Sequence, residues 1–187
     1  MKIKSFVFKH VGNREETARA QVVGVLSKFR QYGLWERYTE LYPHEDLVFT
    51  VGESDYRKDW FYVQVPRRNQ DNSYEGTTWQ IKFKLQNVQR AAIYKLRITL
   101  AGATLAEVQV RVNDPNKARP VFTTGLIGRD NAVARLGIHG LYWLYHVHIS
   151  GSLLVEGQNT IYLKQPRNQS PFQGIMYDYI RLEGPPN

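Results

Sequence analysis

Hydrophobic and polar residues alternate through much of this chain, the pattern of β-strands that bury one face. In 79–85, Trp, Ile, Phe and Leu occupy every second position, with Gln and Lys between them. Similar patterns predict strands over 94–100, 106–112, 141–149 and 159–164, and shorter strands over 47–51, 60–65 and 121–124. Many short strands separated by turns predict an all-β fold, an antiparallel jelly-roll β-sandwich.

The C-terminal run 174–183 has the same period of two. Met176, Ile180 and Leu182 share one face, and the alternation places Asp178 on that apolar face as well. A buried carboxylate must be hydrogen-bonded, ion-paired or bound to a metal. We expect Asp178 to be a structural hydrogen-bonding residue. A structural calcium ligand and a catalytic group are the alternatives, and no other cofactor is predicted.

The N-terminal part differs, because 15–29 carries an apolar stripe with helical spacing. We therefore predict an N-terminal helical extension or arm over 1–28, and the jelly-roll domain over 29–187. The aromatic-rich segment 29–38 is predicted to be an irregular arm that packs over the sandwich, with Pro43 excluding a helix beyond it. A helical turn is predicted at 55–58.

Composition narrows the classes of partner. The chain has 187 residues, a formal net charge of +8 and no cysteine. A positive charge of this size suits nucleic acid, anionic lipid or a polyuronic polysaccharide. No run approaches the roughly 20 apolar residues of a membrane span, and the apolar run 5–8 is too short for a secretory signal. We predict no membrane partner.

Motifs for catalysis and nucleic-acid recognition are missing from the sequence. There is no nucleophile elbow, phosphate-binding loop, dinucleotide fingerprint or zinc-protease motif. Nucleic-acid binding is not predicted either, because the aromatic residues mostly occupy inward strand positions. His146 and His148 share a strand face and have a spacing that metals use, but we expect them to be exposed and solvated.

Five strings of residues carry a specific resemblance. They are FRQYGLWERY at 29–38, SDYRKDWF at 54–61, GTTWQI at 76–81, GIHGLY at 137–142 and SLLVEGQNTI at 152–161. These strings, together with the closing strand at Asp178, resemble the C-terminal part of plant rhamnogalacturonan lyases of polysaccharide lyase family four. The resemblance runs from about Phe29 to Pro186.

This resemblance implies a galactose-binding-like, carbohydrate-module jelly roll, the third domain of such enzymes. The family carries its catalytic residues in a large N-terminal domain that cannot fit here. No catalytic residue is carried over, and no autonomous lyase activity is expected. The resemblance implies an extracellular or cell-wall location, while the lack of a visible signal peptide keeps a cytoplasmic one open.

The function that follows is a carbohydrate-binding module for acidic pectic polysaccharide such as rhamnogalacturonan. Arg and Lys can pair with uronate carboxylates, and aromatic faces can stack on sugar rings. The alternatives are a structural or protein-interaction remnant of a pectin lyase, and an enzyme with its site in loops. Two loops combine cations with aromatics, and their candidate binding residues are Tyr56, Arg57, Lys58, Trp60, Arg135, His139, Tyr142 and Trp143. Trp60 and Trp143 have core packing as their alternative.

Overall fold

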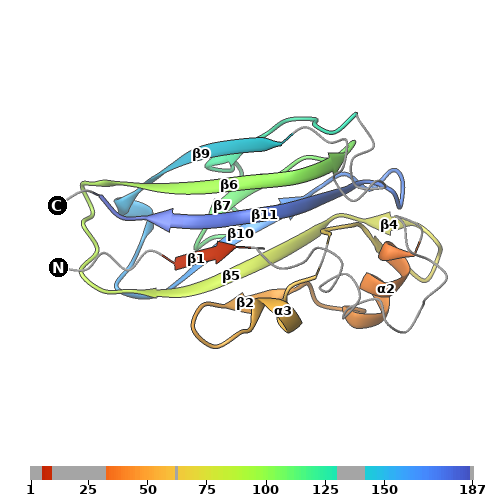
Figure 1. The fold of residues 1–187 in the computed structure, drawn as a ribbon, viewed down its shortest axis with the longest axis horizontal. Helices are drawn as coiled ribbons and strands as arrows, with labels where there is room; N and C mark the ends of the chain where they lie inside the picture. The colour runs from red at the N-terminus through yellow and green to blue at the C-terminus, as the bar shows by residue number, and fades with distance from the viewer. Residues whose placement is uncertain (1–5, 10–32, 62, 130–141, 186–187) are drawn as a thin grey trace.

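The computed structural model describes residues 6–9, 33–61, 63–129 and 142–185, and in it two β-sheets pack face to face around one hydrophobic core (Figure 1). Sheet A has the strand order β1 (Phe6–Lys9), β11 (Gly174–Glu183), β6 (Ile93–Thr104) and β9 (Trp143–Ser150). Sheet B has the order β2 (Val48–Thr50), β5 (Thr77–Leu85), β10 (Gly157–Gln165), β7 (Gln109–Val112) and β8 (Phe122–Thr123). The predicted all-β jelly-roll sandwich is confirmed.

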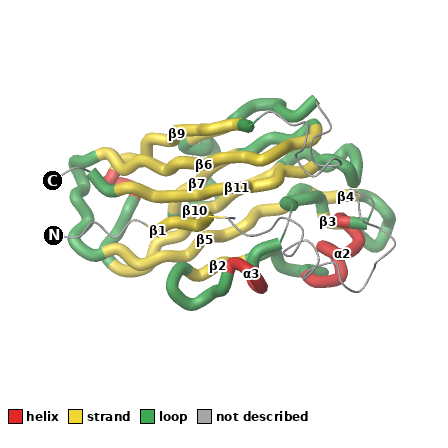
Figure 2. Tube along the Cα trace, in the orientation of Figure 1, coloured by secondary structure: helices red, strands yellow, loops and turns green. Residues whose placement is uncertain are grey.

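Short elements complete the fold at both ends and along one edge (Figure 2). They are the two-stranded sheet β3 (Arg67–Arg68) and β4 (Tyr74–Glu75), the helices α2 (Leu34–Leu41) and α3 (Tyr56–Asp59), and the 3-10 turn η1 (Gly151–Leu153). The helical turn predicted at 55–58 corresponds to α3. Among the described residues no helix has the length and hydrophobicity needed to cross a bilayer.

The alternation in β5 produces the centre of the core. Trp79, Ile81 and Phe83 are all at most 2% exposed, and the residues between them, Gln80 and Lys82, face outward. The Trp79 ring meets the Trp60 ring edge to face at 4.9 Å between centroids. Burying a side chain of this size contributes about 4–6 kcal/mol at 25 cal/mol per Å².

Gln64 joins the two sheets from inside the core. Its backbone bridges Ile175 of sheet A, while its side-chain Nε2 donates to the carbonyls of Thr77 and Leu163 in sheet B, at 3.0 and 2.9 Å. The Tyr177 hydroxyl donates to Gln64 Oε1 at 2.7 Å. Burial raises the pKa of Tyr177, so its hydroxyl keeps the proton that it donates. Gln64 is 0% exposed, and its amide is therefore a buried polar link between the layers.

A β-bulge in β11 corrects the predicted position of Asp178. The pairing of β11 with β6 shifts between Met176 and Tyr177, and again between Tyr177 and Tyr179. The extra residue turns Tyr177 into the core, where it is 1% exposed, and leaves Asp178 on the outer face. A strict period of two cannot show such an insertion. Asp178 is therefore not the buried residue that the alternation predicts.

The segment before β2 also differs from its prediction. Where 29–38 was expected to be irregular, α2 forms and ends at Leu41, before Pro43. It buries Leu34 and Tyr38, which are one turn apart. Burial and the nearby carboxylate of Asp46 raise the pKa of Tyr38, whose hydroxyl donates to Asp46 at 2.9 Å. The helix is thus fixed to the core by one buried tyrosine.

The structure also differs from the predictions of a helical extension at the N-terminus and of a strand over 60–65. Residues 6–9, inside the predicted helical extension, form β1 and pair with β11. The helix predicted over 15–29 lies outside the described residues. The segment 60–65 is buried where described but forms no strand there, only the isolated bridge of Gln64 to Ile175.

Candidate functional site

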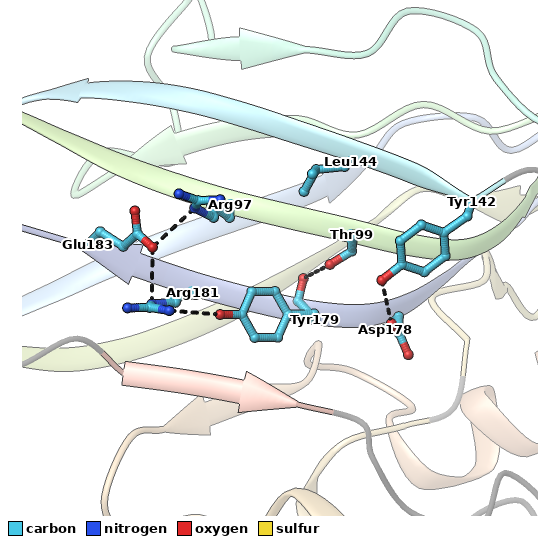
Figure 3. Close-up of a pocket in the computed structure, with 8 residues that line it drawn as sticks. All are labelled: Arg97, Thr99, Tyr142, Leu144, Asp178, Tyr179, Arg181 and Glu183. Atoms are coloured by element: carbon cyan, nitrogen blue, oxygen red, sulfur yellow. Dashed lines mark hydrogen bonds and ion pairs between the residues drawn. The ribbon is translucent and has the colours of Figure 1, made fainter.

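A hollow of about 360 Å³ lies on the outer face of sheet A, over β6, β9 and β11 (Figure 3). Its lining residues are Arg97, Thr99, Tyr142, Leu144, Asp178, Tyr179, Arg181 and Glu183. Most of them are on strands that are hydrogen-bonded to one another, so the backbone fixes their spacing. We call this set the sheet A hollow.

Strand register explains why these side chains meet. Arg181 of β11 lies opposite Arg97 of β6, and Tyr179 lies opposite Thr99, which in turn lies opposite Leu144 of β9. Side chains at directly opposed positions of an antiparallel pair are about 5 Å apart at Cβ. The bulge adds Asp178 to the same face as Tyr179.

Cations gather at one end of the sheet A hollow. Oε1 of Glu183 is 3.1 Å from Arg97 Nε and 3.2 Å from Arg181 Nε, so one carboxylate serves two guanidinium groups (Figure 3). The Tyr179 hydroxyl, which accepts from Arg181 at 3.5 Å, raises the pKa of Arg181, and Glu183 raises it further. The pair Arg97 and Arg181 therefore keeps one positive charge more than Glu183 neutralises.

The other end of the hollow is aromatic and apolar. Tyr142 is 61% exposed and Leu144 is 52% exposed. The Tyr142 hydroxyl donates to Asp178 Oδ2 at 2.8 Å, which directs the phenol ring toward the middle of β11 (Figure 3). An exposed aromatic ring beside a carboxylate offers an apolar face and a hydrogen-bond acceptor to the same ligand.

Further basic side chains continue the face beyond the hollow. His146 of β9 lies opposite Arg97, and His148 lies opposite Lys95, which itself lies opposite Glu183. Both histidines are exposed, as predicted. Across β11, β6 and β9, the rows of Arg97 and Lys95 thus hold cations or imidazoles at every position except Glu183.

This arrangement suits recognition better than acid–base catalysis. Asp178 and Glu183 are five residues apart on one strand, so about 15 Å or more separates them, whereas paired glycosidase carboxylates stand roughly 5 to 10 Å apart. No group of three or more His, Asp or Glu side chains that could hold a metal occurs in the part of the chain that the structure describes. The chemistry on offer is hydrogen bonding, ion pairing and ring contact.

The structure separates the two predicted binding loops. Tyr56, Arg57 and Lys58 lie on α3, beside β2 at the edge of sheet B, whereas Tyr142 and Trp143 lie at the start of β9, the edge strand of sheet A (Figure 1). The Arg57 guanidinium lies 5.6 Å from the centre of the Tyr56 ring. These residues therefore do not form one rim with β9.

Individual predicted residues have different outcomes. Tyr142 lines the hollow, and Trp143 is half-buried with its ring stacked on Tyr145 at 6.3 Å. Trp60 is 4% exposed and packs on Trp79, which corrects its assignment as a binding residue, because its ring has no exposed face for a sugar. Arg135 and His139 lie outside the described residues.

Sequence reasoning missed most of the hollow. Arg97, Arg181 and Glu183 look like ordinary solvent-facing positions of two alternating segments. Their convergence depends on the pairing of β6 with β11, which are about 80 residues apart and carry no local signal of their register. The one signal in the sequence was that each of the two strands places an Arg on the face that its apolar residues do not occupy.

Comparisons with known proteins find similarity to polysaccharide lyases. The family model described as "CBM-like: Polysaccharide lyase family 4, domain III" matches residues 5–182. A rhamnogalacturonate lyase of Dickeya dadantii (strain 3937) is 27% identical over 146 residues, which are 75% of this chain and 22% of that protein. The chain therefore spans about a fifth of the length of this curated relative.

The solved structures to which this chain is similar include two modules of carbohydrate-binding family 35. One, from an environmental isolate, has a TM-score of 0.36 at 15% identity and covers 75% of this chain and 83% of the module. The other, from Cellvibrio japonicus Abf62, has a TM-score of 0.35 at 14% identity and covers 61% of this chain and 67% of the module.

Proposed function

This chain belongs to the CBM-like domain III family of polysaccharide lyase family 4, and from this premise we propose that it binds acidic pectic polysaccharide through the sheet A hollow. The relative's name supplies the ligand class, because rhamnogalacturonate is a polymer that contains uronic acid. The geometry of the hollow supplies the contacts. The chain itself is proposed to be non-catalytic, since the hollow holds no close pair of carboxylates.

The observation that carries this proposal is the shared carboxylate of Glu183. Its Oε1 lies 3.1 Å from Nε of Arg97 and 3.2 Å from Nε of Arg181. A guanidinium has five N–H donors, so both arginines retain donors for a second partner. Arginine binds carboxylates with two parallel hydrogen bonds, and a uronate carboxylate is such a partner.

The rest of the hollow suits the sugar ring. Tyr142 and Leu144 offer exposed apolar surface at the end away from the arginines, and Asp178 can accept a hydrogen bond from a sugar hydroxyl. A uronic acid residue carries its carboxylate on one side of a hydroxyl-rich ring. The hollow has the same division, with cations at one end and an aromatic ring at the other.

Charge around the hollow favours an acidic over a neutral ligand. Lys95, His146 and His148 extend the basic surface, and the whole chain has a net charge of +8. Affinity for an acidic glycan is therefore expected to fall with added salt.

The test is calorimetric titration with rhamnogalacturonan oligosaccharides and, for comparison, neutral galactan oligosaccharides. Arg97→Gln and Arg181→Gln should each weaken binding of the acidic ligand by about 10-fold or more, the value of a charge-assisted hydrogen bond of 1.5–3 kcal/mol. Tyr142→Ala should weaken the binding of both the acidic and the neutral oligosaccharides. Each variant is first shown to melt like the wild type.

Arg37→Gln is the matched control, because Arg37 is an exposed arginine of α2 paired with Glu40 at 2.9 Å and its replacement changes the net charge equally. Arg57→Gln tests the rival site on α3. Equal losses at Arg37, Arg97 and Arg181 would reduce the attraction to diffuse charge and refute the site. A loss at Arg57 alone would move the site to α3.

A further inference from the structure

The outward strand positions of sheet B include cations but no acidic residue. Its outward positions are Val48 and Thr50 in β2, Thr78, Gln80, Lys82 and Lys84 in β5, Gln158, Thr160, Tyr162 and Lys164 in β10, Gln109 and Arg111 in β7, and Thr123 in β8. Four of these residues are cations. The sheet A hollow, in contrast, contains Asp178 and Glu183.

One row across this face combines an aromatic ring with polar neighbours. Tyr162 of β10 lies opposite Gln80 on one side and opposite Arg111 on the other. Tyr162 is half-buried, so part of its surface faces solvent in the middle of the sheet. The row therefore presents an amide, a phenol ring and a guanidinium in sequence, each about 5 Å from the next.

Arg111 holds a charge that no carboxylate neutralises within the described residues. It is 9% exposed, its Nε donates to the carbonyl of Lys117 at 2.9 Å, and its NH1 donates to Gln109 Oε1 at 3.0 Å. Both partners are neutral. A cation removed from water without a counter-ion is costly, and an anionic ligand at the surface beside it would reduce that cost.

The nearby acidic residues of sheet B are already paired. Glu107, just before β7, forms an ion pair with Arg167 at 3.2 Å, and Asp46 pairs with Arg67. Neither lies among the outward positions of the five strands. Glu107 nevertheless reaches the row of Lys164, because its Oε1 accepts from Gln109 Nε2 and Thr123 Oγ1, each at 2.9 Å.

The lysines are spaced along the strands on either side of the ring. Lys82 lies opposite Thr160, one row from Tyr162, and Lys164 is one row away in the other direction. The rows of Lys82 and Lys164 are about 13 Å apart along the strand direction, and the row of Lys84 lies about 7 Å beyond that of Lys82. Cations at intervals along a flat face match a ligand with carboxylates at intervals along a chain.

We infer that the outer face of sheet B is a second binding surface for a uronate-bearing polysaccharide, with Tyr162 beneath one sugar ring and Lys82, Lys164 and Arg111 facing its carboxylates. The choice of ligand class rests on the proposed function. The two sheets pack face to face, so this surface and the sheet A hollow point away from each other (Figures 1 and 2). One protein molecule therefore binds two polysaccharide chains at once.

The test uses oligogalacturonate of about ten residues with the full chain. Calorimetry of the wild type should give two oligosaccharides per protein. Arg97→Gln/Arg181→Gln should leave one of them, and Lys82→Gln/Lys164→Gln should remove the other with an affinity loss of about tenfold. Arg37→Gln/Arg90→Gln changes the net charge by the same amount at two exposed arginines outside both faces, and it should leave the stoichiometry at two.

The outcomes separate this inference from the proposed function. Loss of binding with the sheet B variant alone supports the second surface and refutes the sheet A hollow. Loss with the sheet A variant alone, or a wild-type stoichiometry of one that the sheet B variant leaves unchanged, refutes the second surface. Duplex DNA of equal charge is the second probe, and if it binds as tightly and depends equally on Lys82 and Lys164, the face is a general polyanion surface and the inference fails.

Discussion

Replacing Gln64 with methionine tests how much a single buried amide contributes to holding the two sheets together. Methionine has nearly the same length and shape, so the change removes polar atoms with little loss of packing. It leaves three buried groups without their partner: the carbonyls of Thr77 and Leu163, and the hydroxyl of Tyr177. At about 1–2 kcal/mol for each stranded group, Gln64→Met should lower the free energy of unfolding by roughly 3–6 kcal/mol. That is a large part of the 5–15 kcal/mol typical of a domain.

The assay is equilibrium unfolding in urea, followed by the fluorescence of the buried Trp60 and Trp79. Tyr177→Phe removes only the hydroxyl that donates to Gln64, so combining the two changes isolates their coupling. The double variant should be more stable than the sum of the single losses predicts, by about 1–2 kcal/mol, because the phenylalanine no longer needs a partner. Gln86→Met, at an exposed position after β5, is the control and should stay within about 0.5 kcal/mol of the wild type. If Gln64→Met is destabilised by less than 1 kcal/mol, the hydrogen bonds across the sheets carry no net stability and the reasoning is wrong.

Two other stability measurements follow from the structure. Asp178→Ala should lower the free energy of unfolding by less than about 1 kcal/mol, because it loses one hydrogen bond to the exposed Tyr142. A chelator should leave the melting temperatures of the wild type and the variant unchanged. A loss of about 2 kcal/mol or more would mean that Asp178 is buried after all. Burial alone raises the pKa of Glu107, but its hydrogen bonds and Arg167 together hold that pKa below its ordinary value. The stability that this contributes is present above the unfolded-state value of about 4.3 and is lost as the pH falls through the folded-state value. The destabilisation by Glu107→Gln should therefore shrink between pH 6 and pH 3, and a penalty independent of pH would contradict this.

Most of the fold could be predicted because alternation is local. The inward rows of β5 and β10 lie where the pattern of Trp79 and Ile161 places them. The pattern fails where pairing decides the outcome. The bulge makes Asp178 an extra residue in β11, which turns Tyr177 into the core and Asp178 outward, while a second register shift keeps Met176 buried as the alternation predicts. The parallel pairing of β2 with β5 and the pairing of β1 with β11 are likewise contacts between distant segments.

The candidate site was less accessible to sequence reasoning than the fold. The search for aromatic residues near cations identified Tyr142 but also Trp60, whose ring is buried in the core. Arg97 and Arg181 could not be singled out, because a charged residue on an outward strand position is the usual case. Only the register that brings both to Glu183 distinguishes them.

The pairing of β1 with β11 has a mechanical consequence. Phe6 lies opposite Leu182 in an antiparallel pair, so residues early and late in the chain are neighbours across one strand boundary. A force that pulls these two residues apart acts across the strands and breaks their hydrogen bonds one after another. The inner pair of β11 with β6 extends over almost the whole length of β11 and would have to open afterwards. Under tension this sandwich should first yield by peeling β1 away at low force, while both proposed binding faces keep the strands that form them.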